Sequence, residues 1–140
     1  MFYADTSVLV AVFTQEDASK RATAWLRRSE SEGVAISEWV AAEFAAALST
    51  KIRMKQIDEG YRDKAFSLFT TTVRESIQVA PVTEAHFKRA AQFAHDYKLG
   101  LRAGDALHLA IASDQKAVLC TLDKRLASAG RALGLAIQLI

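Results

Sequence analysis

The stretch that decides the fold is Phe2-Tyr3-Ala4-Asp5-Thr6-Ser7, a short apolar run that ends at a carboxylate. Four similar runs follow along the chain. Each is apolar or β-branched throughout instead of alternating with polar residues, which is typical of strands buried on both faces of a sheet. The five predicted strands cover residues 2–4, 34–36, 77–80, 117–121 and 136–139.

Stretches with helical periodicity separate these runs, and the chain holds only six Gly and one Pro to interrupt them. Strands that alternate with helices favour a parallel sheet with helices on both of its faces. We therefore predict an α/β fold with a five-stranded parallel sheet, built as a single domain over residues 1–140. The predicted helices cover residues 18–29, 38–53, 57–74, 84–97, 102–113 and 124–133.

Composition excludes several classes of protein but names no function. The hydrophobic fraction of 51% and the charged fraction of 24% exclude wholesale disorder. The 18 Lys and Arg against 16 Asp and Glu give a net charge of +2, which permits an anionic partner without predicting one. Cys120 is the only cysteine, so an intrachain disulfide and a CxxC metal site are excluded. With no signal peptide and no uncharged run of about 20 residues, we expect a cytoplasmic protein without a membrane segment.

Most of the 16 acidic residues lie in polar surroundings, but four do not, and we refer to them as the four acids. Glu43 is the most unusual, because its helical neighbours three and four positions away are all apolar. A buried carboxylate is costly unless it meets a cation or is neutralised. The four acids are Asp5, Glu43, Asp105 and Asp123.

Each of the four acids also has a purely structural interpretation. Asp5, Asp105 and Asp123 would each serve as the N-cap of a helix. Glu43 would either extend to solvent at the edge of its alanine-rich helix or pair with a distant arginine. Topology favours a shared site, because ligands bind beyond the carboxyl ends of parallel strands where the strand order reverses. Asp5 and Asp123 follow the first and fourth predicted strands. We therefore expect the four acids to converge on one edge of the sheet.

Four carboxylates without Cys or paired His favour a hard divalent cation, Mg²⁺ or Mn²⁺. Such a site supports hydrolysis of a phosphodiester bond. Arg102, close to Asp105, is a candidate for contacting the phosphate of the substrate. For His108 we favour a packing role over a contact with Asp105. Two alternatives remain open at this point: a non-catalytic cation-binding module, and a flavodoxin-like signalling domain that uses Asp5 and Asp123.

Four blocks of sequence, taken in order, resemble the PIN-domain family and most closely its VapC-type toxins from bacterial toxin–antitoxin modules. They are Asp5-Thr6-Ser7-Val8-Leu9, Glu43 within residues 37–49, Gly104-Asp105-Ala106-Leu107-His108-Leu109-Ala110, and Thr121-Leu122-Asp123.

The resemblance implies a PIN-like three-layer fold and a Mg²⁺- or Mn²⁺-dependent endoribonuclease that acts on RNA. It further implies a cognate antitoxin as inhibitor and usually a homodimer. Carried over by position, the four acids are the catalytic and metal-binding residues, with Thr6 and Thr121 as polar supports. Two positions depart from the family pattern: Gly104, where a helix-favouring residue is more usual, and Leu126, where relatives often have an aromatic residue.

Overall fold

The structure, a computed structural model that describes residues 1–140, contains one five-stranded parallel sheet. The order of the strands across the sheet is β3-β2-β1-β4-β5, with β1 in the centre. In register, Tyr3 of β1 lies between Ala35 of β2 and Leu119 of β4. The α/β class, the parallel sheet and all five strands are as the sequence predicts. The strands are β1 (Phe2–Ala4), β2 (Val34–Ser37), β3 (Gln78–Ala80), β4 (Val118–Thr121) and β5 (Ile137–Leu139).

The strand order reverses between β1 and β4. From β1 the chain proceeds outward through β2 and β3, and it then crosses back to place β4 on the other side of β1. The carboxyl ends of β1 and β4 therefore border the crevice where an open parallel sheet binds its ligands. The observed order 3-2-1-4-5 also differs from the 2-1-3-4-5 order of flavodoxin-like domains. The structure therefore does not support the alternative of a flavodoxin-like signalling domain.

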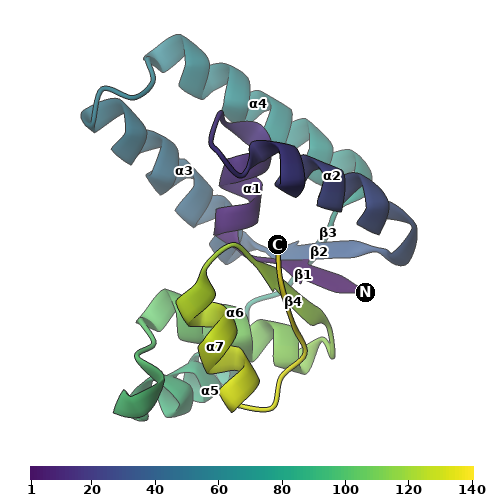
Figure 1. Cartoon of the computed structure of the whole chain (residues 1–140), viewed down its shortest axis with the longest axis vertical. Coiled ribbons are helices and arrows are strands. Elements are labelled where there is room, and N and C mark those ends of the chain that lie inside the picture. Colours follow the sequence, from purple (N-terminus) through teal and green to yellow (C-terminus); the bar gives the residue numbers. More distant parts are fainter.

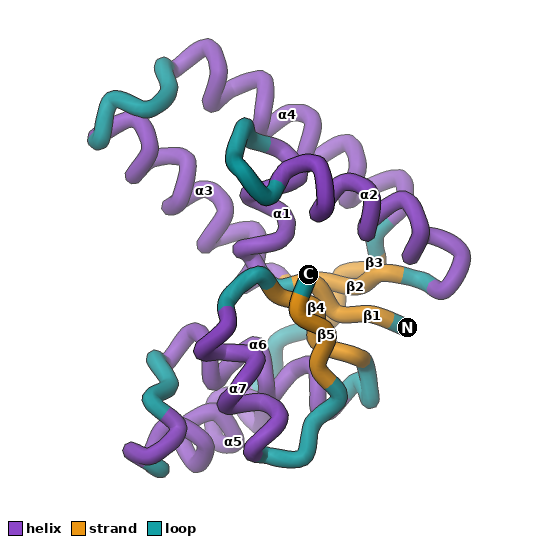
Figure 2. The backbone as a smooth tube through the Cα atoms, viewed as in Figure 1, coloured by secondary structure: helices purple, strands orange, loops and turns teal.

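Seven helices cover the sheet in two layers, which together with the sheet make three (Figure 1). The first four helices lie on one face and the last three on the other, with the strands between them (Figure 2). No helix is both long enough and apolar enough to cross a membrane. The helices are α1 (Thr6–Phe13), α2 (Ser19–Ser29), α3 (Glu38–Arg53), α4 (Glu59–Ser76), α5 (Glu84–His95), α6 (Ala103–Asp114) and α7 (Lys124–Ala132).

Helix α1 is the one helix that the sequence did not predict. After Thr6 and Ser7 its residues, VLVAVF, are all apolar and include three valines, so they show neither a polar face nor a strong helical propensity. The helix forms because it is packed against α2, α3 and α4, and because Asp5 caps its first turn by accepting a hydrogen bond from the backbone of Val8. Burial against other helices thus outweighs the local preference.

An aromatic cluster fixes α3 against α1 and α4. The rings of Phe44 and Phe69 stack with their centroids 4.4 Å apart, and Phe13 meets both rings edge-on. Phe44 is fully buried and immediately follows Glu43, so this packing sets the position of Glu43 on the helix. All three rings are buried in the core.

Candidate active site

The four acids all lie at the edge of the sheet where its strands end. Asp5 directly follows β1, and Asp123 follows β4 after one residue. Glu43 lies in the second turn of α3, which begins where β2 ends, and Asp105 lies in the first turn of α6. Residues that are far apart in the sequence are therefore brought to one region by the parallel topology.

Asp5 is the deepest of the four acids, with only 3% of its surface exposed. Its Oδ1 accepts hydrogen bonds from the hydroxyl of Ser7 (2.6 Å) and the backbone of Val8 (3.2 Å), and its Oδ2 accepts one from Thr121 (2.6 Å). No lysine or arginine pairs with it. Burial raises the pKa of Asp5 above its ordinary value, and these hydrogen bonds and His108 only partly oppose that effect.

Thr121 and Ser7 connect Asp5 to the loop that carries Asp123. The hydroxyl of Thr121 accepts a hydrogen bond from the backbone of Asp123 (2.9 Å) while it donates to Asp5. In the same way, the hydroxyl of Ser7 accepts from the backbone of Leu122 (3.0 Å) while it donates to Asp5. Each hydroxyl thus donates one hydrogen bond and accepts another, which fixes the position of Asp5 relative to the loop of Leu122 and Asp123.

Asp123 is also the N-cap of α7. Its Oδ1 accepts hydrogen bonds from the backbone N–H groups of Arg125 (2.7 Å) and Leu126 (3.1 Å). Its Oδ2 makes no hydrogen bond within the protein. The capping interpretation and the ligand interpretation are therefore compatible, because each uses a different oxygen.

Glu43 binds to two side chains through a single oxygen. Its Oε2 lies 2.7 Å from Nε2 of His108 and also accepts a hydrogen bond from the hydroxyl of Thr6. Burial acts to raise the pKa of Glu43, but His108 and Thr6 outweigh it, so the pKa lies below its usual value. The buried indole N–H of Trp39 makes no hydrogen bond, yet it also acts to lower the pKa of Glu43. Glu43 is thus held as an anion.

His108 does not have the simple packing role that we favoured from the sequence. It is 97% buried, but both of its ring nitrogens lie near polar groups: Nε2 near Glu43, and Nδ1 3.2 Å from the hydroxyl of Tyr3. It makes no hydrogen bond or ion pair with Asp105. The sequence did show that His108 and Asp105 share a helix, but only the fold reveals that α3 brings Glu43 against this histidine.

Asp105 caps its own helix and lies near a cation. Its Oδ2 accepts a hydrogen bond from the backbone of Arg102 (3.2 Å) and lies 3.9 Å from the guanidinium of Arg125. The side chain of Arg102 is exposed and has no partner among the four acids. Arg125 is the residue that sequence reasoning missed, because nothing in its neighbourhood distinguishes it from an ordinary solvated arginine.

The four acids offer oxygen atoms that are partly free of hydrogen bonds. Three oxygens receive no hydrogen bond from the protein, and each belongs to a different acid: Glu43 Oε1, Asp105 Oδ1 and Asp123 Oδ2. Asp5 Oδ2 has a single partner and keeps a free lone pair. No group of three or more Asp, Glu, His or Cys side chains is arranged to hold a metal ion. The chemistry of the donors, oxygen only and partly unengaged, still matches Mg²⁺ or Mn²⁺.

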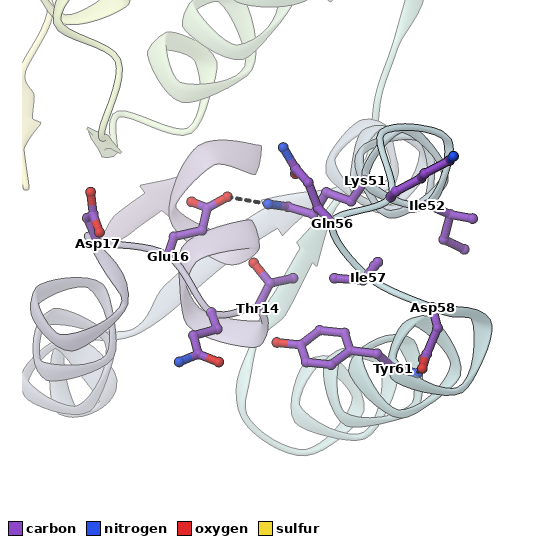
Figure 3. A pocket seen from close by; sticks show the side chains of 11 residues that line it. Thr14, Glu16, Asp17, Lys51, Ile52, Gln56, Ile57, Asp58 and Tyr61 are labelled. Atoms are coloured by element: carbon purple, nitrogen blue, oxygen red, sulfur yellow. Dashed lines mark hydrogen bonds and ion pairs between the residues drawn. The ribbon is translucent and has the colours of Figure 1, made fainter.

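Two hollows open near this edge of the molecule. One, of about 500 Å³, is lined in part by Thr6, Ser7 and Asp123. The larger one, of about 960 Å³, lies between the end of α1 and the turn from α3 to α4 (Figure 3). Glu16 lines both, and in the larger hollow its carboxylate pairs with Lys51 at 2.7 Å (Figure 3). The smaller hollow gives access to the candidate site.

Comparison with known families adds an independent observation. The family model of the PIN domain matches residues 2–132. The chain belongs to the PIN-domain family. No curated protein matches the sequence significantly.

Solved structures share the fold of this PIN domain at low sequence identity. FitAcB from Neisseria gonorrhoeae is 19% identical, with a TM-score of 0.70 over 98% of this chain and 96% of that one. VapBC2 from Rickettsia felis, bound to a DNA fragment from its promoter, is 15% identical, with a TM-score of 0.73 over 99% and 98%. PAE2754 from Pyrobaculum aerophilum is 20% identical, with a TM-score of 0.70 over 97% and 81%. The PIN-like α/β fold is therefore established.

Proposed function

We propose that this PIN domain is a Mg²⁺- or Mn²⁺-dependent endoribonuclease whose four acids are the metal-binding and catalytic residues. The observation that carries the proposal is Asp5, a buried carboxylate that has no basic partner and lies where the strand order reverses. Such a group is costly unless a cation compensates it. A divalent ion held there would polarise the phosphoryl oxygen of the substrate and make a bound water more acidic.

The residues around the acids have distinct tasks in this proposal. Thr121 and Ser7 orient Asp5, and Thr6 orients Glu43. The exposed guanidinium of Arg102, at the start of α6, is available to contact a phosphate of the RNA. The hollow beside Thr6 and Asp123 would admit the substrate.

We further propose that the whole chain, residues 1–140, acts as one toxin unit of a toxin–antitoxin pair in the cytoplasm. Support comes from its structural neighbours, which include a toxin–antitoxin complex from Klebsiella pneumoniae and VapBC-5 from Mycobacterium tuberculosis. A cognate antitoxin protein and a homodimer are the partners that we expect. Co-expression with the neighbouring open reading frame, followed by size measurement of the purified complex, tests both.

Cleavage of RNA by single-site variants tests the enzymatic proposal. Wild type should cleave single-stranded RNA with Mn²⁺ or Mg²⁺ and lose activity in EDTA, whereas Asp5→Asn and Asp105→Asn should be at least about 100-fold slower. Glu75→Gln changes an exposed acid near the end of α4 and should cleave like wild type. Wild-type cleavage by both aspartate variants would refute the proposal.

Metal binding separates the enzyme from a non-catalytic binding module. Calorimetric titration with Mn²⁺ should show binding to wild type and much weaker binding to Asp5→Asn. A wild-type protein that binds Mn²⁺ but cleaves no RNA under any condition would favour the binding module.

A further inference from the structure

Buried polar side chains run in an unbroken line from the core to Glu43. The hydroxyl of Ser37, at the end of β2, lies 2.8 Å from the hydroxyl of Tyr3 on β1. The hydroxyl of Tyr3 lies 3.2 Å from Nδ1 of His108, and Nε2 of His108 lies 2.7 Å from Oε2 of Glu43. Ser37 and Tyr3 are fully buried. A line of this kind inside a core needs every donor matched to an acceptor.

The direction of the hydrogen bonds follows from the end at Glu43. An ionised carboxylate can only accept, so Nε2 of His108 must carry a proton and donate it to Oε2. In a neutral imidazole Nδ1 is then the acceptor, and the hydroxyl of Tyr3 donates to it. A tyrosine hydroxyl is a donor at neutral pH, and its oxygen can accept at the same time. The hydroxyl of Ser37 completes the line by donating to the oxygen of Tyr3.

This arrangement gives the two oxygens of Glu43 different roles. Oε2 is occupied by His108 and Thr6, whereas Oε1 makes no hydrogen bond. Oε1 lies beside Gly104 at the start of α6, so close that a Cβ atom at position 104 would be 2.9 Å from it. The next residue along that helix is Asp105. Glu43 is therefore anchored by one oxygen and presents the other toward the start of α6.

We propose that His108 is a positioning residue, which anchors Oε2 of Glu43 so that Oε1 is directed to a divalent cation, and that Tyr3 fixes the tautomer of His108. The part that concerns the cation rests on the proposed function. His108 itself touches neither metal nor substrate. Partners that orient a metal ligand in this way commonly change metal affinity by about 10- to 100-fold when they are removed.

Nitrogen NMR of the metal-free full chain tests the line of hydrogen bonds without reference to activity. In EDTA at a pH where His108 is neutral, its ring should carry the proton on Nε2 and none on Nδ1. A proton on Nδ1 in wild type would overturn the proposal.

Mn²⁺ titration of four variants tests the positioning role. His108→Leu should weaken Mn²⁺ binding by about 10-fold or more, and Tyr3→Phe should weaken it in the same direction although Tyr3 does not touch Glu43. His108→Gln can offer an amide N–H in place of Nε2 and should restore the affinity to within about threefold of wild type. The matched control is His86→Leu.

His86 is a suitable control because it is as buried as His108 and also has polar partners at both ring nitrogens. Its contacts, however, stabilise the start of α5 and do not involve the four acids. Its Nδ1 accepts from the backbone of Thr83, and its Nε2 lies 3.2 Å from Asp114. His86→Leu should lower the free energy of unfolding and leave Mn²⁺ affinity unchanged. Equal Mn²⁺ affinity of His108→Leu, Tyr3→Phe and wild type would overturn the positioning role.

Failure of this proposal is distinguishable from failure of the proposed function. If Asp5→Asn loses Mn²⁺ binding while His108→Leu and Tyr3→Phe keep it, the metal site stands and the positioning role is wrong. If wild type binds no Mn²⁺ and cleaves no RNA, both the proposed function and the cation part of the positioning role are wrong. The NMR result then still decides whether His108 donates to Glu43.

Discussion

At the scale of single residues, Asp5 and Glu43 belong to the same candidate site but have opposite electrostatic surroundings. Burial dominates for Asp5 and raises its pKa, whereas His108 and Thr6 dominate for Glu43 and lower its pKa. Asp5 is thus the acid that is costly to keep ionised, and Glu43 is the acid that the protein holds ionised. A cation would therefore relieve the greater cost at Asp5.

Asp5→Asn should make the metal-free protein more stable at neutral pH. Because the pKa of Asp5 is higher in the folded state, folding stability falls as the pH rises above the unfolded value of about 3.8. The asparagine cannot ionise, so its advantage should grow from pH 4 to pH 7.5. Urea unfolding in EDTA across this range measures it. A wild type more stable than the variant at pH 7.5 would contradict the prediction.

Gly104→Ala should have opposing effects on stability and on metal binding. Alanine favours a helix by up to about 1 kcal/mol over glycine. The new Cβ would however lie 2.9 Å from Oε1 of Glu43 and 3.5 Å from the ring of Trp39, so the carboxylate must move. We expect Mn²⁺ affinity to fall by about 10-fold, with less than about 1 kcal/mol change in stability.

Gly60→Ala is the matched control for this substitution. Gly60 is also the second residue of its helix, and the nearest atom to its added Cβ lies at an ordinary 3.6 Å. Calorimetry and urea unfolding should show a change in stability alone. If both glycine variants bind Mn²⁺ with equal affinity, Glu43 can move away from a Cβ atom at position 104 without loss of binding, and the prediction is wrong.

At the scale of elements, the start of a helix has two tasks in this protein. The helices α1, α6 and α7 all begin at the edge of the sheet that holds the candidate site. Asp5 and Asp123 accept backbone hydrogen bonds from the first turns of α1 and α7, and Asp105 accepts one from Arg102, the residue just before α6. The sequence showed both roles and could not choose between them. The structure shows that they coexist, because a carboxylate has two oxygens.

Two substitutions at Asp123 should separate capping from metal binding. Asparagine caps a helix as well as aspartate, so Asp123→Asn should keep the stability of the metal-free protein within about 0.5 kcal/mol. Asp123→Ala removes the cap of α7 and should cost about 1 kcal/mol. Both variants should weaken Mn²⁺ binding, because both remove the charge. An asparagine variant as unstable as the alanine variant would indicate that the charge itself holds α7. Urea unfolding in EDTA measures the difference.

At the scale of the whole molecule, the site joins the two helical layers. Glu43 comes from α3 on one face of the sheet, and Asp105 comes from α6 on the other (Figure 1). Setting the four acids aside also leaves the rest of the molecule with a clear excess of basic residues over acids. The near-neutral total charge therefore combines four acids at the candidate site with a net positive charge on the rest of the molecule. Such a positive charge would favour binding of an RNA substrate.

Saturating Mn²⁺ should stabilise the whole fold against unfolding. At a free concentration 100 times the Kd, binding to the native state alone contributes about 2.7 kcal/mol. For a domain of this size we expect the Tm to rise by roughly 5 to 10 °C. Thermal unfolding followed by circular dichroism measures this shift, and Asp5→Asn should abolish it. An unchanged Tm of wild type at millimolar Mn²⁺ would contradict a metal site between the layers.

The sequence by itself determined the α/β class and the five strands, because strands buried on both faces are apolar throughout. It also singled out the four acids, because their neighbours in the sequence do not explain them as ordinary surface charges. It did not reveal α1, because the residues from Val8 to Phe13 are all apolar and show no polar helical face. Nor could it show that Glu43 meets His108, or that Gly104 makes room for Glu43. These contacts join positions up to 65 residues apart, and they form because α3 and α6, on opposite faces of the sheet, both begin at the edge where the strands end.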